Sequence, residues 1–106
     1  MFARIVSVPL KPGKTLEYAK AVEKGAIPLI RTHKGFVDEI NLVTADGKTG
    51  FGISFWENKE SAEAYSRSGS SEVLKTVDAV AAAPAQVQLC EVTNSTVHRI
   101  KAALAA

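Results

Sequence analysis

Residues 41–56 read NLVTADGKTGFGISFW, and this stretch decides the fold. The dipeptide Asp46-Gly47 is typical of a tight turn that joins two antiparallel strands. Apolar and β-branched residues stand on both sides of the turn. We therefore predict a hairpin, with one strand from Phe36 to Thr44 and the next from Phe51 to Trp56.

The segment before the hairpin predicts a strand followed by a helix. Residues Phe2 to Leu10 are rich in β-branched side chains, and the turn Lys11-Pro12-Gly13 ends them. Apolar residues then recur at helical spacing from Thr15 to about His33. Gly25 and Pro28 lie inside this range, so we expect a kink or a tightened last segment rather than a straight helix.

The segment after the hairpin predicts a helical region followed by a strand. A helical region runs from Lys59 to about Ala82, and the run Ser68-Gly69-Ser70-Ser71 divides it into two pieces. Pro84 ends the region, and residues 87–92 predict the last strand.

The predicted order is β-α-β-β-α-β, which is that of a ferredoxin-like α+β fold with a four-stranded antiparallel sheet. The chain has 106 residues, 46% hydrophobic and 23% charged, which is ordinary for one globular domain. We assign this domain to residues 1–96. Residues 97–106 are expected to be a tail that is either a short helix or disordered.

Apolar side chains occur on both faces of the predicted sheet. Phe51, Ile53 and Phe55 share one face of their strand, and Trp56 points to the other. In the preceding strand, Phe36, Ile40 and Leu42 are expected to oppose Val37 and Val43. Two helices can cover only one face, so a second copy is expected to cover the other and form a homodimeric α+β barrel. The alternative is that these residues are exposed singly, as in many monomers.

Charge and cysteine content exclude several classes of function. The net charge is only +2, from 13 basic and 11 acidic residues, without the dense basic stripe that nucleic-acid binding requires. Cys90 is the only cysteine, so neither an internal disulfide nor a thiolate metal cluster is expected. No apolar run reaches the length of about 18 residues that a membrane-spanning helix needs. We expect a cytoplasmic protein that binds neither nucleic acid nor membrane.

Several motifs occur in an order that resembles the antibiotic biosynthesis monooxygenase (ABM) domain family of dimeric α+β barrels. The resemblance covers about residues 1–95. It rests on the strand start Phe2-Ala3-Arg4-Ile5-Val6, the turn Lys11-Pro12-Gly13, the run Ile27-Pro28-Leu29-Ile30 before Gly35-Phe36, the strand end Ser54-Phe55-Trp56-Glu57, and the helix start Lys59-Glu60-Ser61-Ala62-Glu63-Ala64-Tyr65.

The resemblance implies cofactor-free oxidation of quinol-like aromatics, haem degradation, or a domain with no assigned activity, and the residues must choose among them. At the positions of the haem-degrading members this chain has Ser7, Tyr65 and Lys75, and a lysine does not replace the histidine that binds haem iron. His33 and His98 are far apart in the sequence and form no metal motif. We therefore expect no metal and no organic cofactor.

The candidate site lies on one face of the sheet. By strand parity, this face is expected to carry Ser7, Asn41, Gly52, Ser54 and Trp56, with Tyr65 reaching it from the second helical region. Small side chains in mid-sheet leave room for a planar aromatic ligand. Tyr65 and Asn41 would bind substrate oxygens and Trp56 would line the wall. The alternative is that all of them are ordinary packing residues, and no strong general base is predicted.

These residues, together with the resemblance, lead to one function and one alternative. The first is a cofactor-independent monooxygenase that oxidises a small, quinol-like aromatic with molecular oxygen. The alternative is a non-catalytic dimeric barrel that binds a small ligand or serves as an accessory domain.

Overall fold

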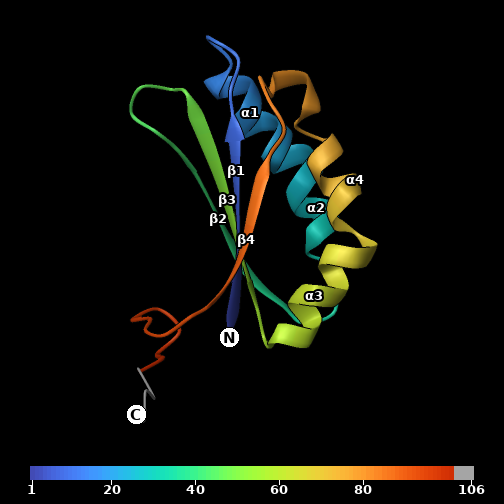
Figure 1. Cartoon of the computed structure of the whole chain (residues 1–106), viewed down its shortest axis with the longest axis vertical. Helices are drawn as coiled ribbons and strands as arrows, with labels where there is room; N and C mark the ends of the chain where they lie inside the picture. Colours follow the sequence, from blue (N-terminus) through green and yellow to red (C-terminus); the bar gives the residue numbers. More distant parts are fainter. Residues whose placement is uncertain (102–106) are drawn as a thin grey trace.

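The computed structural model describes residues 1–101 and has the predicted β-α-β-β-α-β order (Figure 1). The elements are β1 (Phe2–Pro9), α1 (Thr15–Ala21), the π-helical turn η1 (Val22–Ala26), α2 (Ile27–Ile30), β2 (Phe36–Val43), β3 (Thr49–Trp56), α3 (Lys59–Ser68), α4 (Ser70–Lys75), the 3₁₀ turn η2 (Asp78–Val80) and β4 (Gln86–Glu91).

The four strands form one antiparallel sheet in the order β2-β3-β1-β4. The helices cover only one face of this sheet (Figure 1). We call the face toward the helices the inner face and the opposite one the outer face. This arrangement confirms the predicted ferredoxin-like α+β fold.

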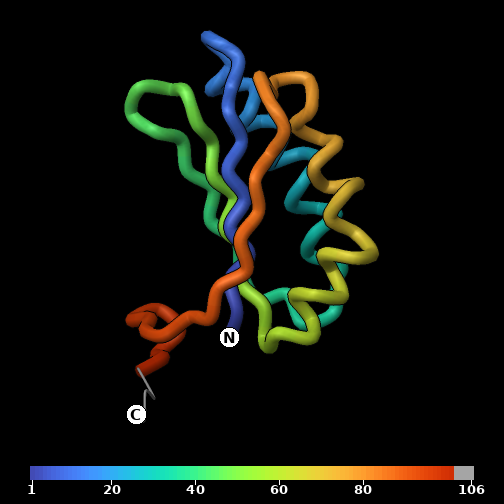
Figure 2. The backbone as a smooth tube through the Cα atoms, viewed as in Figure 1, coloured from blue at the N-terminus to red at the C-terminus, as the bar shows by residue number. Residues whose placement is uncertain are grey.

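The first helical segment is not one regular α-helix, as its sequence predicts. The chain passes from α1 through the π-helical turn η1 into α2 without leaving a helical path (Figure 2). Gly25 lies in the π-helical turn, where a Cβ would be 3.0 Å from Cβ of Thr76. Pro28 has no N–H to continue the hydrogen bonds of this path, and it lies directly after the π-helical turn. Glycine therefore allows close packing against the end of α4, and proline coincides with the irregular part of the helix.

The hairpin forms around Asp46-Gly47 as predicted, but strand β2 contains an irregularity that was not. Gly47 adopts a φ of +74°, as this tight turn requires. Register shifts between Phe36, which pairs with Trp56, and Asp38, which pairs with Phe55. This β-bulge puts Phe36 on the inner face, so the expectation that it shares a face with Ile40 and Leu42 is wrong.

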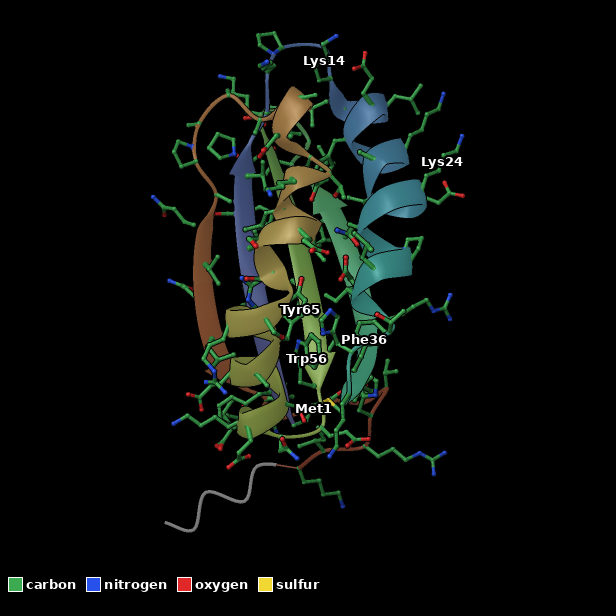
Figure 3. The ribbon with its side chains drawn as sticks, turned by 90° about the vertical axis from the view of Figure 1, so that its right-hand side faces the viewer. Met1, Lys14, Lys24, Phe36, Trp56 and Tyr65 are labelled. Atoms are coloured by element: carbon green, nitrogen blue, oxygen red, sulfur yellow. The ribbon has the colours of Figure 1, made fainter. Side chains whose placement is uncertain are left out.

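An aromatic stack forms the core under α3. Trp56 is fully buried, and its ring stacks on Tyr65 with centroids 4.8 Å apart. Phe36 meets Trp56 edge-on at 5.7 Å, and Figure 3 shows the three rings between sheet and helices. The indole Nε1 of Trp56 donates a hydrogen bond of 2.9 Å to Oγ of Ser54, so burial leaves no polar atom of this ring unpaired.

The described part of the C-terminal tail is a turn rather than a helix. Ser95 and Ile100 close it with two backbone hydrogen bonds of 2.9 and 2.8 Å. The His98 ring lies 5.5 Å from that of Phe55, and its Nε2 is 3.7 Å from Oδ2 of Asp38. The turn therefore packs against the outer face, while residues 102–106 of the expected tail lie outside the described residues.

Gly50→Ala should destabilise the fold through a close approach in the core. A Cβ at Gly50 would lie 2.6 Å from Cζ of the buried Tyr18, so that ring must move. Such overpacking costs about 1–3 kcal/mol of unfolding free energy. Denaturant unfolding checks it, with Gly52→Ala on the same face as the control.

At Gly52 the nearest atom to a new Cβ would be Nδ2 of Asn41, at 3.2 Å. This is the end of a flexible side chain, which can give way more easily than the Tyr18 ring. An equal loss of stability in both variants would contradict the assignment of the Gly50–Tyr18 contact as the tight one.

Candidate functional site

A small cavity lies between the inner face and the helices. Its volume is about 40 Å³, enough for a few water molecules. Its wall is mainly aliphatic, with Val6, Val8, Val22, Ala26 and Ile30 among the lining residues. Six polar side chains interrupt this wall: Arg4, Tyr18, Glu39, Asn41, Ser54 and Tyr65. An apolar pocket with a few polar groups is typical of a small-molecule site.

A larger groove of about 280 Å³ adjoins the cavity. It runs between the first helical segment and β2, where Ala19, Glu23, Ile27 and Val43 line it. Tyr18, Val22, Glu39 and Asn41 line both spaces and form the boundary between them. A ligand in the groove would therefore meet these four side chains before it reached the cavity.

The structure brings together most of the site residues named from the sequence. Asn41, Ser54 and Tyr65 line the cavity, as does Gly52. Trp56 does not line the cavity. Its ring stacks on Tyr65 and its Nε1 donates a hydrogen bond to Ser54, so it supports two residues that do.

The placement of Ser7 with these residues is wrong. Ser7 pairs with Phe51, whereas Val6 pairs with Gly52, so Ser7 points to the outer face. Successive side chains of a strand alternate between faces, and only the register between β1 and β3 shows which set points inward.

Arg4 is a buried site residue that the sequence reasoning missed. It lies on the inner face with only 5% of its surface exposed, and its Nε donates a 3.2 Å hydrogen bond to Oγ of Ser66 in α3. Its guanidinium carbon is 5.2 Å from the centroid of the Tyr65 ring, within the range of a cation–π interaction. The available signal was parity, because Arg4 alternates with Val6 and Val8 on one side of the strand.

Glu39 is the second missed residue, and it supplies the carboxyl group that no motif predicted. Glu39 pairs with Ser54, and Ser54 in turn pairs with Arg4. These three residues therefore form a row across β2, β3 and β1. Parity was the available signal here too, because Glu39 stands two residues before Asn41, which the sequence already places on this face.

Burial changes the protonation behaviour of the cavity groups. It raises the pKa of Glu39 above its usual 4.5, and the Asp38 charge adds to this, while Asn41 and Arg4 act in the opposite direction. Burial also raises the pKa of Tyr65 to about 12, although the Arg4 cation opposes it. A carboxyl group with a raised pKa is a better proton acceptor when ionised, and a phenol with a raised pKa stays protonated and can donate a hydrogen bond.

Tyr18 and Arg4 complete the titratable set. Burial raises the pKa of Tyr18, with a smaller opposing effect from hydrogen bonding to Asn41. Burial lowers the pKa of Arg4, which nevertheless remains a cation because a guanidinium titrates far above neutral pH. At neutral pH the cavity therefore contains one fixed cation, one carboxyl group and two protonated phenols.

In residues 1–101, no three His, Cys, Asp or Glu side chains gather as a metal site would require. The expectation that the protein works without metal or organic cofactor stays a prediction. The same part of the chain has no helix long and apolar enough to cross a membrane.

Tyr65→Phe should keep the fold and weaken ligand binding or turnover by about two- to tenfold, the effect of one lost hydrogen bond. The ring stack with Trp56 survives this change, so the melting temperature should be unaltered. Thermal unfolding and a ligand titration measure the two effects. Unaltered binding and turnover would leave Tyr65 as a packing residue only.

Three solved structures place this geometry among known proteins. One is a provisionally assigned antibiotic biosynthesis monooxygenase from Nitrosomonas europaea, 20% identical, with a TM-score of 0.68 over 89% of this chain and all of that one. The second is a monooxygenase of Streptomyces coelicolor (ActVA-Orf6) in complex with the ligand nanaomycin D, 16% identical, with a TM-score of 0.74 over 89% of this chain and 88% of that one.

The third is a mutant of SnoaB, a cofactor-independent oxygenase from Streptomyces nogalater, 14% identical, with a TM-score of 0.69 over 90% of this chain and 95% of that one. One further matching structure is of a protein of unknown function. No family model and no curated protein matches the sequence itself. At these identities the likeness concerns the fold, and it shows that the chain has the antibiotic biosynthesis monooxygenase (ABM) fold.

Proposed function

We propose that this protein is a monooxygenase that oxidises a small, quinol-like aromatic with molecular oxygen and without a cofactor. The observation that carries the proposal is the content of the cavity. A carboxyl group of raised pKa shares an aliphatic and aromatic wall with two protonated phenols and a cation. Solved oxygenases with this fold add support, although fold alone does not determine function.

The reaction requires little more from the protein than these groups provide. A quinol that loses a hydroxyl proton becomes electron-rich enough to reduce dioxygen directly. Oxygen then adds to a ring carbon, and loss of water leaves the hydroxylated quinone, so one quinol and one O₂ give one hydroxyquinone and one water. The protein supplies a proton acceptor, an orientation for the ring and shelter from solvent.

The sizes of the two spaces indicate how such a substrate is held. A cavity of about 40 Å³ cannot contain an aromatic ring, since even benzene needs a cavity on the order of 150 Å³. The adjoining groove of about 280 Å³ can. We place the ring in the groove and its reactive oxygen at the boundary with the cavity.

Oxygen uptake by the purified protein tests the proposal. Dihydroxynaphthalenes and hydroquinones serve as substrates, and we expect saturable consumption of one O₂ per molecule oxidised. Heat-denatured protein controls for spontaneous oxidation. Binding of these compounds without any uptake would instead support the alternative function, a non-catalytic barrel that binds a small ligand.

We also propose that the protein is a homodimer formed through the outer faces of two sheets. The large apolar side chains on this face of β1, β2 and β3 are Ile5, Ile40, Leu42, Phe51, Ile53 and Phe55. Ile40 and Leu42 are 44% and 48% exposed, and a second copy would cover them.

Cys90 is a free thiol, which is typical of reducing compartments, and a cytoplasmic location stays a prediction.

A further inference from the structure

Arg4 and Glu39 carry opposite charges and line one small cavity, yet they do not form an ion pair. Within residues 1–101 the acidic and basic side chains whose nitrogen and oxygen atoms lie within 4.0 Å of each other are Lys14 with Glu17 and His98 with Asp38. Buried charges without a partner are costly, so proteins normally pair them. Arg4 is buried, with contacts to Ser66 and the Tyr65 ring, and Glu39 is partly buried, so a polar group placed between them would gain from both.

The strand register explains the gap. Ser54 of β3 stands between Arg4 of β1 and Glu39 of β2, so the two charged residues are separated by two strand spacings, roughly 9–10 Å. The Ser54 side chain is short, and its Oγ already accepts the hydrogen bond from Trp56. Arg4 is drawn toward α3 by its bond to Ser66, while Glu39 borders the groove. Arg4, Ser54 and Glu39 all line the small cavity, so its space is shared by the two charged residues.

We propose that this gap binds a single ionisable hydroxyl group of the ring ligand, with Arg4 and Glu39 as its two partners. The hydroxyl reaches Glu39 first, because Glu39 lines both the groove and the cavity, and then meets Arg4, which lines only the cavity. The inference rests on the proposed function, since it names the group by which that site recognises its substrate.

The proton transfer between these groups leaves the cavity's total charge unchanged. The ligand O–H bond breaks, its proton forms a new O–H bond on the Glu39 carboxylate, and the electron pair stays on the ligand oxygen. Arg4 then donates hydrogen bonds to this oxyanion, and Glu39 becomes neutral. One cation and one anion are present before and after the step, so no uncompensated charge is buried.

The same arrangement should reject a ligand with a carboxylate in place of the hydroxyl. A carboxylate enters already ionised and has no proton for Glu39, so two anions would share the cavity with one cation. Removal of like charges from water without compensation is unfavourable. We therefore infer a site selective for weakly acidic hydroxyl groups, such as phenols, over carboxylic acids on the same ring.

Binding without oxygen tests the inference separately from turnover. Wild-type protein is titrated anaerobically with 1-naphthol, 1-naphthoate and naphthalene at a pH where free 1-naphthol is neutral. We expect 1-naphthol to bind about tenfold or more tightly than either of the others, the effect of a hydrogen bond to a charged group. The bound naphthol should also show the absorption of naphtholate.

Two variants assign the partners. Glu39→Gln should abolish the naphtholate absorption, because glutamine cannot accept the proton. Arg4→Met should weaken 1-naphthol binding about tenfold or more and leave naphthalene binding nearly unchanged. Thermal unfolding shows whether each variant is folded. If Arg4→Met does not fold, the absorption spectrum of 1-naphthol bound to Glu39→Gln still tests the inference.

Each outcome bears on a different conclusion. Equal binding of 1-naphthol and 1-naphthoate, or bound naphthol that stays neutral, would overturn the inference, and the gap would then belong to a bridging water. Expected binding without oxygen uptake in air would overturn the proposed oxygenase function and leave this site intact. Failure of all three ring compounds to bind would overturn both.

Discussion

Replacing Glu39 with glutamine should lower the rate of oxygen uptake by about 10²- to 10⁴-fold, the usual contribution of a general base. Glu39 is the one carboxyl group that lines the cavity, and burial gives it a raised pKa. Glutamine has nearly the same shape but cannot accept a proton. Initial rates of oxygen uptake with a hydroquinone measure the effect.

Glu57→Gln is the matched control for this variant. Glu57 follows β3, is exposed and does not line the cavity, so the same chemical change there should leave the rate unaltered. If Glu39→Gln retained the wild-type rate, the proton would leave the substrate by another route, and the assignment of Glu39 as the base would be wrong.

The stability of Glu39→Gln should change in the opposite direction to its activity. Folding raises the pKa of Glu39, so it favours the neutral acid. The stability gained from the neutral form is complete below the ordinary glutamate pKa and is lost as pH rises through the folded-state value. Glutamine mimics the neutral form at every pH. Above the folded-state pKa, the variant should therefore melt at the same temperature as the wild type or higher.

The pH dependence of turnover gives a second readout of the same group. Activity should rise as pH increases through the pKa of Glu39, which lies above the usual 4.5. The charged and polar groups around it are Arg4 on β1, Asp38 and Asn41 on its own strand, and the phenols of Tyr18 on α1 and Tyr65 on α3. An acid limb at the ordinary glutamate value, or one that persists in Glu39→Gln, would contradict this role.

Local signals account for the part of the fold that the sequence predicts. Asp46-Gly47 specifies its turn because a positive φ is easy only for glycine, and Gly47 has one. Gly25 and Pro28 predict the irregular part of the first helical segment, because each disfavours a regular helix at its own position. The order of the elements along the chain then leaves few possible topologies for four strands and two helical regions.

The charged half of the site was missed although local parity pointed to it. Arg4 and Glu39 are charged residues on strands, which normally point to solvent. Arg4 alternates with Val6 and Val8, and Glu39 alternates with Asn41, so each lies on the face of its inward-pointing neighbours. The error at Ser7 has a different origin, because only the pairing of β1 with β3 shows which set of β1 residues points inward.

Phe55→Asp should convert the proposed dimer into a folded monomer. Phe55 is half-buried on the outer face, where it meets His98 of its own chain but no helix. In a face-to-face dimer it would lie between two sheets, and an unpaired carboxylate there costs several kcal/mol, on the order of 2–7 for a polar group. The single chain keeps its helix-covered core, so its circular dichroism should stay close to that of the wild type.

Leu16→Asp is the matched control, since it makes the same kind of change at a site on α1 that is already 66% exposed. Sedimentation at micromolar concentration should give twice the chain mass of 11.3 kDa for wild type and Leu16→Asp, and the single mass for Phe55→Asp. A wild-type protein that sediments at the single mass would show that its outer face is not a dimer interface. A Phe55→Asp dimer would show that the second copy binds elsewhere.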